Sequence, residues 1–262
     1  MAEKIADTID TIAPLSTQQL LAFKERGVIR FIARVSRSTG QLDTDGIQNM
    51  KNAIEAGIKV ELYIFPKVND EKNSPQMQAE KVIDALGEDL YNKVDRIWVD
   101  VEKDHFNNNK LFGSGWTCKP SNTSEQEWLC KKRNFVHDIV NTFQNHGLKV
   151  GIYTSKEGWH EAVGDYDGLK RLPLWWPRYN NSPNVGYNPF GGWELPMFHQ
   201  YQGDVRMEIT YTMESGVKKT EWIRVDKNHY NEPSFEEMMK EYHRHFGGSA
   251  DIFHPSYSRN QS

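Results

Sequence analysis

Strand-like and helix-like segments alternate along the first 155 residues, and this alternation limits the possible folds more than any other feature. Short apolar runs rich in Val, Ile and Phe are followed by longer segments with helical periodicity that mostly end at glycine. The predicted strands are 5–12, 31–36, 60–65, 96–102 and 149–155, and the predicted helices are 17–26, 43–56, 75–91 and 125–145. Strands separated by helices favour parallel strands with the helices outside them.

The helices shorten after residue 155, and three further strands are expected at 174–179, 197–202 and 222–226. The sequence therefore predicts an α/β fold, a TIM-like barrel with a degenerate second half of the (β/α)5(β)3 type. A length of 262 residues suits one such barrel. We expect a single catalytic domain over 1–262, with a core at about 5–230 and a C-terminal helix and tail at 231–262.

The charge balance excludes several classes of function. Lys plus Arg number 32 and Asp plus Glu 36, so the formal net charge is −4 and no clustered basic excess marks a nucleic-acid binder. No apolar run approaches the ~20 residues of a membrane span. We expect a monomer without nucleic-acid or membrane partners. The opening MAEKIADTID shows no apolar signal-peptide core, so a signal was either removed or never existed.

The segment 103–124 follows a predicted strand and lacks periodicity, which favours a functional loop. Cys118 lies in it and Cys130 just beyond, so a bridge could close the loop, and two free thiols are the alternative. Two cysteines cannot form a zinc framework, and the nine histidines include no HExxH pattern. No metal site is predicted.

The sharpest motif is Trp98-Val99-Asp100-Val101-Glu102 at the end of a predicted strand. Residues two apart share a strand face, so the tryptophan and both carboxylates point the same way. Barrel enzymes place their chemistry at the strands' C-terminal ends. Two like charges this close raise the pKa of at least one, which prepares a proton donor beside an ionised partner. A pair of solvated acids at a strand exit is the alternative.

Two more acids lie at predicted strand ends, Asp10 on the first strand and Asp226 on the last. These two acids lie close to Asp100 and Glu102 only if the barrel closes. Aromatic and amide side chains cluster at the same ends and suit sugar rings, which offer apolar faces and hydroxyl edges. These candidate substrate-binding residues are Tyr63, Trp98, Tyr153, Trp175, Trp176, Tyr179, Gln200 and Tyr201. Packing in the barrel core is the alternative for each of them.

Together these motifs resemble the family-25 glycoside hydrolases, lysozymes first known from fungi and phages, and most of all the branch found in nematodes and protists. The Trp-x-Asp-x-Glu signature at 98–102 is the most specific match. The other matching segments are 9–16, 31–34 with Arg34 kept, 63–66, 151–155, 174–179, 189–193 and 200–201, with Asp226 on the last strand. A polar insertion at 207–219 has no counterpart in the family pattern.

The resemblance implies hydrolysis of the β-1,4 bond between N-acetylmuramic acid and N-acetylglucosamine in bacterial peptidoglycan, without metal or cofactor. By the same resemblance Glu102 is the general acid, Asp100 orients the substrate acetamido group and Asp10 lines the pocket. Arg34 and Asp226 join the substrate-binding residues. An extracellular or phagosomal and lysosomal location, with a role in defence against bacteria, is implied as well.

Two other functions compete with this reading. A chitinase-like barrel also ends a strand with Asp-x-Glu, but its longer Asp-x-x-Asp-x-Asp-x-Glu run is only partly present, because Trp98 stands where its middle Asp would be while Asp95 fits the first. A non-catalytic cell-wall sugar-binding barrel is the rival from another class. The joint presence of Asp10, Asp100 and Glu102 argues against such a loss of catalysis.

Overall fold

The computed structural model describes residues 6–107, 110–112, 115–183 and 185–231. The chain divides into two units, Met1–Asn231 and Glu232–Ser262, and every described residue belongs to the first. The predicted C-terminal helix and tail therefore lie outside the described residues. That 1–262 forms a single domain stays a prediction.

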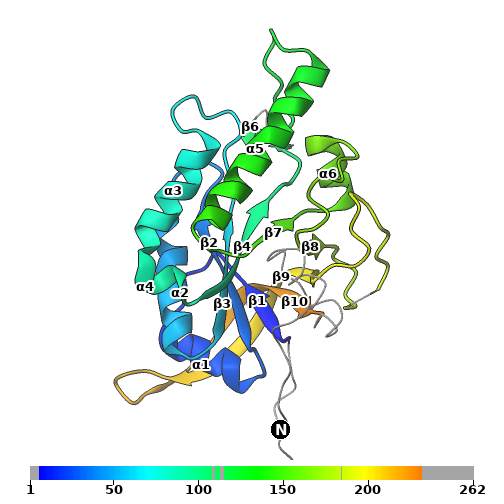
Figure 1. Ribbon diagram of the computed structural model, residues 1–262. Coiled ribbons are helices and arrows are strands. Elements are labelled where there is room, and N and C mark those ends of the chain that lie inside the picture. The colour runs from blue at the N-terminus through cyan, green and yellow to red at the C-terminus, as the bar shows by residue number, and fades with distance from the viewer. Residues whose placement is uncertain (1–5, 108–109, 113–114, 184, 232–262) are drawn as a thin grey trace, which may run out of the picture. The chain divides into compact units, whose positions relative to one another are not determined.

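Eight strands of the first unit close into a ring in the order β1-β10-β9-β8-β7-β4-β3-β2 (Figure 1). Neighbouring strands are parallel except that β10 runs antiparallel to both β9 and β1. The strands are β1 (Thr8–Asp10), β2 (Arg30–Ser36), β3 (Lys59–Ile64), β4 (Val94–Asp100), β7 (Val150–Tyr153), β8 (Leu174–Pro177), β9 (Phe198–Thr212) and β10 (Lys218–Tyr230). The predicted α/β class is confirmed.

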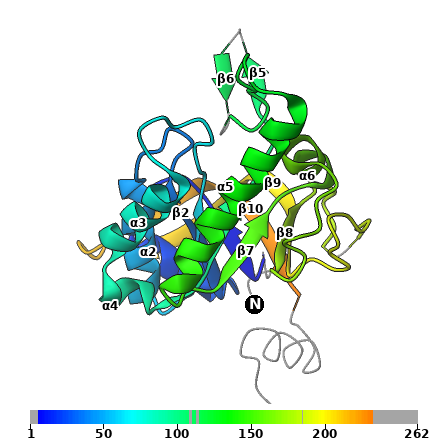
Figure 2. The same ribbon diagram turned by 45° about the horizontal axis from the view of Figure 1, so that its top comes forward.

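Helices follow the first five strands of the ring and lie outside it (Figures 1 and 2). They are α1 (Thr17–Glu25), α2 (Thr44–Glu55), α3 (Pro75–Leu86), α4 (Glu88–Tyr91), α5 (Glu125–Asn145) and α6 (Lys156–Val163). The single helix predicted at 75–91 is divided at Gly87. This glycine has a φ of 67°, which ends α3 because the left-handed region favours glycine.

The segment 103–124 contains a small antiparallel hairpin, β5 (His105–Asn107) with β6 (Lys110–Phe112), next to one end of α5 (Figure 2). The cysteine bridge that the sequence left open is not formed, and both thiols are free. The backbone of Cys118 is held in a turn, where its amide donates to the Gly115 carbonyl and its own carbonyl accepts from Asn69. Cys130 lies on the exposed side of α5, so the two thiols are held apart by separate elements.

Two apolar clusters stabilise the fold. The larger one packs the helices against the outside of the ring. The smaller one fills the ring's interior with Ile32, Trp98, Tyr153, Trp175 and Phe198. Trp98 is fully buried, and its indole Nε1 donates to Oε2 of Glu61 at 2.5 Å. The interior cluster forms a packed floor beneath the strands' C-terminal ends.

The last two strands are much longer than predicted. The polar insertion at 207–219 is the outer part of a hairpin in which β9 and β10 pair from 198 to 230. Figure 1 shows this hairpin, yellow to orange, running past α1. Alternate residues of the hairpin are buried, with Met207, Ile209, Ile223 and Val225 on one face. This apolar alternation covers only two positions on each strand, so it does not lengthen the strands predicted from the sequence.

Candidate active site

Gln200 lies at the centre of a hydrogen-bond network at the C-terminal ends of the parallel strands. It is 2% exposed, and its amide uses every donor and acceptor it has. Oε1 accepts from the hydroxyls of Tyr153 at 2.8 Å and Tyr179 at 3.0 Å. Nε2 donates to Oδ2 of Asp10 at 2.9 Å and Oδ2 of Asp226 at 3.2 Å. One amide therefore fixes two carboxylates and two phenols.

Asp10 and Asp226 face each other because their residues pair directly between β1 and β10. Asp10 also accepts from Nδ2 of Asn228 at 2.7 Å. Burial raises the pKa of Asp10 well above its usual range, the charge of Asp226 adds to this, and the two amides oppose it. Sequence reasoning missed Asn228, which shares a strand face with Asp226 two residues further on. Extending the last predicted strand by one pleat would have found it.

Asp100 is the last residue of β4, and Glu102 lies two residues beyond it. Burial raises the pKa of Asp100 well above its usual range, with Glu102 and Asp10 adding and Arg34 opposing. Burial also raises the pKa of Glu102 to about 6, while hydrogen bonding with Tyr153 lowers it and the charge of Asp226 raises it. Oδ1 of Asp100 is buried and has no hydrogen-bond partner among the described residues. The pair thus offers a proton donor beside an open acceptor.

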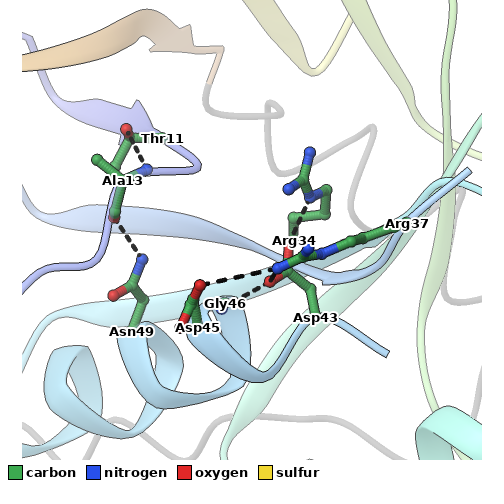
Figure 3. Close-up of polar contacts among 8 residues, drawn as sticks. All are labelled: Thr11, Ala13, Arg34, Arg37, Asp43, Asp45, Gly46 and Asn49. Atoms are coloured by element: carbon green, nitrogen blue, oxygen red, sulfur yellow. Dashed lines mark hydrogen bonds and ion pairs between the residues drawn. The ribbon is translucent and has the colours of Figure 1, made fainter. Parts of the chain in front are cut away.

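Arg34, on β2, is held by the N-terminus of α2 (Figure 3). Its Nε contacts Oδ2 of Asp43 at 2.6 Å, while Arg37 contacts Oδ1 of the same carboxylate at 2.8 Å. Burial opposes ionisation of Asp43, but the hydrogen bonds from Arg37 and Arg34 lower its pKa overall. A Cβ on Gly46 would lie 1.6 Å from the carbonyl oxygen of Arg34, so only glycine lets helix and strand approach this closely.

Four of the predicted aromatic residues lie at three levels of the site. Tyr63 lies near the carboxylates. Burial is the main cause that raises the pKa of its phenol, and the charge of Asp10 adds to it. Tyr179 is 59% exposed and reaches the network from the rim. Trp98 and Trp175 belong to the floor, where Nε1 of Trp175 donates to Oδ1 of Asn228 at 2.7 Å. These two indoles support the site from below.

The structure places Trp176 and Tyr201 on the outer side of the strands. Adjacent strand residues face opposite sides, so Trp176 points away from the interior that holds Trp175. It is 4% exposed and stacks on His199 at 4.4 Å in the outer apolar cluster. Tyr201 has an edge contact with His199 and shares its face, opposite to that of Gln200. Both side chains therefore lie on the face turned away from Gln200, and a role for them in substrate binding stays a prediction.

A pocket of about 290 Å³ opens beside this network. Its lining residues are Tyr179, Asn181, Gln202, Gly203, Asp204, Val205 and Asp226. Over the part of the chain that the structure describes, no cluster of three His, Cys, Asp or Glu residues could hold a metal ion. Within the same residues no helix is long and apolar enough to cross a membrane.

Comparison with known proteins decides the family. The family described as "Lysozyme-like protein 1" matches residues 1–201, which include every strand end of the network except that of β10. This chain belongs to the lysozyme-like proteins of glycoside hydrolase family 25. The match includes Asp10, Asp100, Glu102 and Gln200, whereas Asp226 lies beyond it.

Relatives of this family-25 protein are found in nematodes and social amoebae. It is 33% identical to "Lysozyme-like protein 5" of Caenorhabditis elegans over 74% of this chain and 82% of that protein. It is 28% identical to "Probable GH family 25 lysozyme 5" of Dictyostelium discoideum over 75% and 83%. The solved family GH25 lysozyme of Aspergillus fumigatus superposes with a TM-score of 0.58 at 20% identity, over 90% and 98% of the two chains. That likeness shows a shared fold.

Proposed function

We propose that this glycoside hydrolase is a lysozyme that cleaves the β-1,4 bond between N-acetylmuramic acid and N-acetylglucosamine in bacterial peptidoglycan. One observation carries the proposal. Glu102, with a pKa raised to about 6, lies beside the buried Oδ1 of Asp100, which has no hydrogen-bond partner among the described residues, at the strands' C-terminal ends. Relatives named as lysozymes support the choice of substrate.

Glu102 is the general acid of the proposed reaction. A carboxyl group with a pKa near 6 keeps its proton in mildly acidic solution and can pass it to the glycosidic oxygen as that bond breaks. Oδ1 of Asp100 accepts the N–H of the substrate 2-acetamido group and turns its carbonyl oxygen toward C1. That oxygen forms a bond to C1 as the leaving group departs, giving an oxazolinium ion.

Water then attacks C1 from the side of the departed sugar and opens the oxazolinium ring. The ionised Glu102 takes the water's proton, which returns the enzyme to its starting state with net retention at C1. Asp10 is buried in the same site and is held by Gln200 and Asn228. Burial raises the pKa of Asp10 as it does that of Asp100, which disfavours the build-up of negative charge in the site.

The test is hydrolysis of bacterial cell walls, followed by loss of turbidity and by mass spectrometry of the new reducing ends. Wild type is expected to release N-acetylmuramic acid ends, and Glu102→Gln to lose about 10²–10⁴ in rate, the usual worth of a general acid. Glu88→Gln, an exposed matched change on α4, is the control, and thermal melts verify folding. Cleavage of chitin oligomers but not of walls would indicate the chitinase-like alternative. Binding to walls without cleavage would indicate the sugar-binding alternative.

We also propose a barrel type and a cellular location for this lysozyme. Five strand–helix units followed by β8, β9 and β10 support a TIM-like barrel of the (β/α)5(β)3 type. A lysozyme meets bacterial walls outside the cell or in phagosomes and lysosomes, so we place its work there as an antibacterial hydrolase. Fractionation of the native protein with phagosomal markers tests this location.

A further inference from the structure

The β9–β10 hairpin continues past the end of the ring on the side of the active site. Asp10, at the C-terminal end of β1, pairs with Asp226 of β10. Residues of β10 before Asp226 pair only with β9, so they extend beyond the mouth of the ring. Thr11 fixes the base of this extension, because its hydroxyl donates to the Arg224 carbonyl at 2.7 Å.

The two faces of this extension differ. The odd-numbered face packs toward α1, since Ile223 and Val225 are buried and Glu221 contacts Gln19 of that helix. Residues two apart share a face, so Asp226, Arg224 and Trp222 lie on the opposite side in one row.

Trp222 is the exposed aromatic residue of that row, with 63% of its surface accessible. Thr210 and Thr220 share a hydroxyl–hydroxyl contact of 2.8 Å beside it, and Glu208 lies directly across from it on β9. An accessible indole among hydroxyl and charged groups suits a ring that has one apolar face and a polar edge. Sugar rings have that form.

The pocket beside the active site shares Asp226 with this face. Asp226 forms part of its wall and also accepts from Nε2 of Gln200 at 3.2 Å. Asp204 lines the pocket from the hairpin side, where its amide donates to Oδ1 of Asp226 at 2.5 Å and its carboxylate pairs with Arg224. Its φ of 54° is rare for a residue other than glycine, and these two contacts hold the bend. Asp226 therefore belongs both to the wall of the pocket and to the row that ends at Trp222.

We propose that the hairpin face from Asp226 to Trp222 is a distal binding site for the glycan strand of peptidoglycan, with Trp222 stacking on a sugar ring beyond the cleaved bond. The proposal rests on the proposed lysozyme function. Four strand residues separate the two Cα atoms by about 14 Å, further than one sugar ring reaches. Only a strand of several sugars can occupy both the active site and Trp222.

Chain-length dependence of binding tests the proposal. The probes are long glycan strands without and with stem peptides and a peptidoglycan tetrasaccharide. Titration calorimetry measures their affinity for the full chain carrying Glu102→Gln, which prevents turnover. We expect long strands to bind more tightly than the tetrasaccharide. Trp222→Ala should weaken the affinity for long strands roughly fivefold and leave that for the tetrasaccharide unchanged. Trp222→Tyr should keep part of the affinity for long strands. Leu195→Ala, which removes an exposed apolar side chain away from the hairpin, is the control.

Each outcome decides between the proposals. If Trp222→Ala binds long strands as tightly as its parent, the distal site is wrong while the lysozyme function stands. If the loss occurs only with strands that carry stem peptides, the face binds peptide and this inference is overturned. If wild type neither cleaves nor binds any of these glycans, the proposed function itself fails.

Discussion

The Tyr153 hydroxyl donates its hydrogen bond to Oε1 of Gln200 at 2.8 Å, although it also bonds with Glu102. A phenol carries a single proton, so it can donate to only one of these partners at a time. When Glu102 holds a proton, Tyr153 is free to donate to Gln200. When Glu102 is ionised, its charge attracts the phenol proton. The protonation state of the proposed acid is thereby linked to the network that holds Asp10 and Asp226.

The pH profile of activity should follow the pKa of Glu102. Because the acid must be protonated in the free enzyme, kcat/KM should fall about tenfold per pH unit above a limb near pH 6. Tyr153→Phe removes a bond that lowers this pKa, so the limb should move to higher pH. Asp226→Asn removes a charge that raises it, so the limb should move to lower pH. Profiles that shift in the same direction in both variants would contradict this assignment. Tyr91→Phe on α4 is the matched control.

Gln200→Glu should destabilise the protein and impair activity together. The change removes the donors to Asp10 and Asp226 and places a further carboxyl group between them. Buried groups left without partners cost on the order of 1–3 kcal/mol, and the loss should be largest at neutral pH, where repulsion adds to it. Denaturant unfolding at pH 4 and pH 7 measures both parts. Equal stability to wild type at pH 7, or an equal loss in the exposed Gln48→Glu control, would show that the network adds nothing.

The sequence predicted the parallel order of the strands because helix and strand periods differ, and glycines ended most of the helices. It also predicted that Trp98 and Asp100 share a face, since that follows from the period of two alone. The pair Trp175-Trp176 shows the limit of this reasoning. Adjacent residues must face opposite sides, but the sequence does not say which one faces inward. Pairing with Phe198 and His199 decides it, and that depends on register between distant strands.

The role of Gln200 as the centre of the network could not be predicted in the same way. Its four partners come from β1, β7, β10 and the segment after β8, and they meet only when the ring closes. Asn228 was missed because the polar residues of β10 concealed the true length of that strand. The polar insertion at 207–219 continues two strands of the ring.

Glu61, beneath the floor, should make stability fall as pH rises. Burial raises its pKa to about 7 despite Arg96, Trp98 and Arg30, so the folded state binds its proton more tightly than the unfolded chain does. Its contribution is fully present below pH 4.5 and is lost as pH rises through about 7. As pH rises between those limits, the unfolding free energy of the wild type should therefore fall by on the order of 3 kcal/mol more than that of Glu61→Gln. Unfolding free energies measured across this range check the slope, and parallel curves would contradict it.

Gly151→Ala should be strongly destabilising because of one contact. The new Cβ would lie 2.3 Å from Cζ3 of Trp98, on the strand paired directly with it, whereas the backbone there has no positive φ that would itself require glycine. Overpacking of this kind costs about 1–3 kcal/mol and sometimes more. Trp98→Phe replaces the indole with a smaller side chain and relieves this contact. The double variant should therefore lose about 0.5–3 kcal/mol less unfolding free energy than the two single variants lose together. Denaturant unfolding of the wild type, the two single variants and the double variant measures this coupling. Simple additivity would mean that the indole does not set the requirement for glycine at position 151.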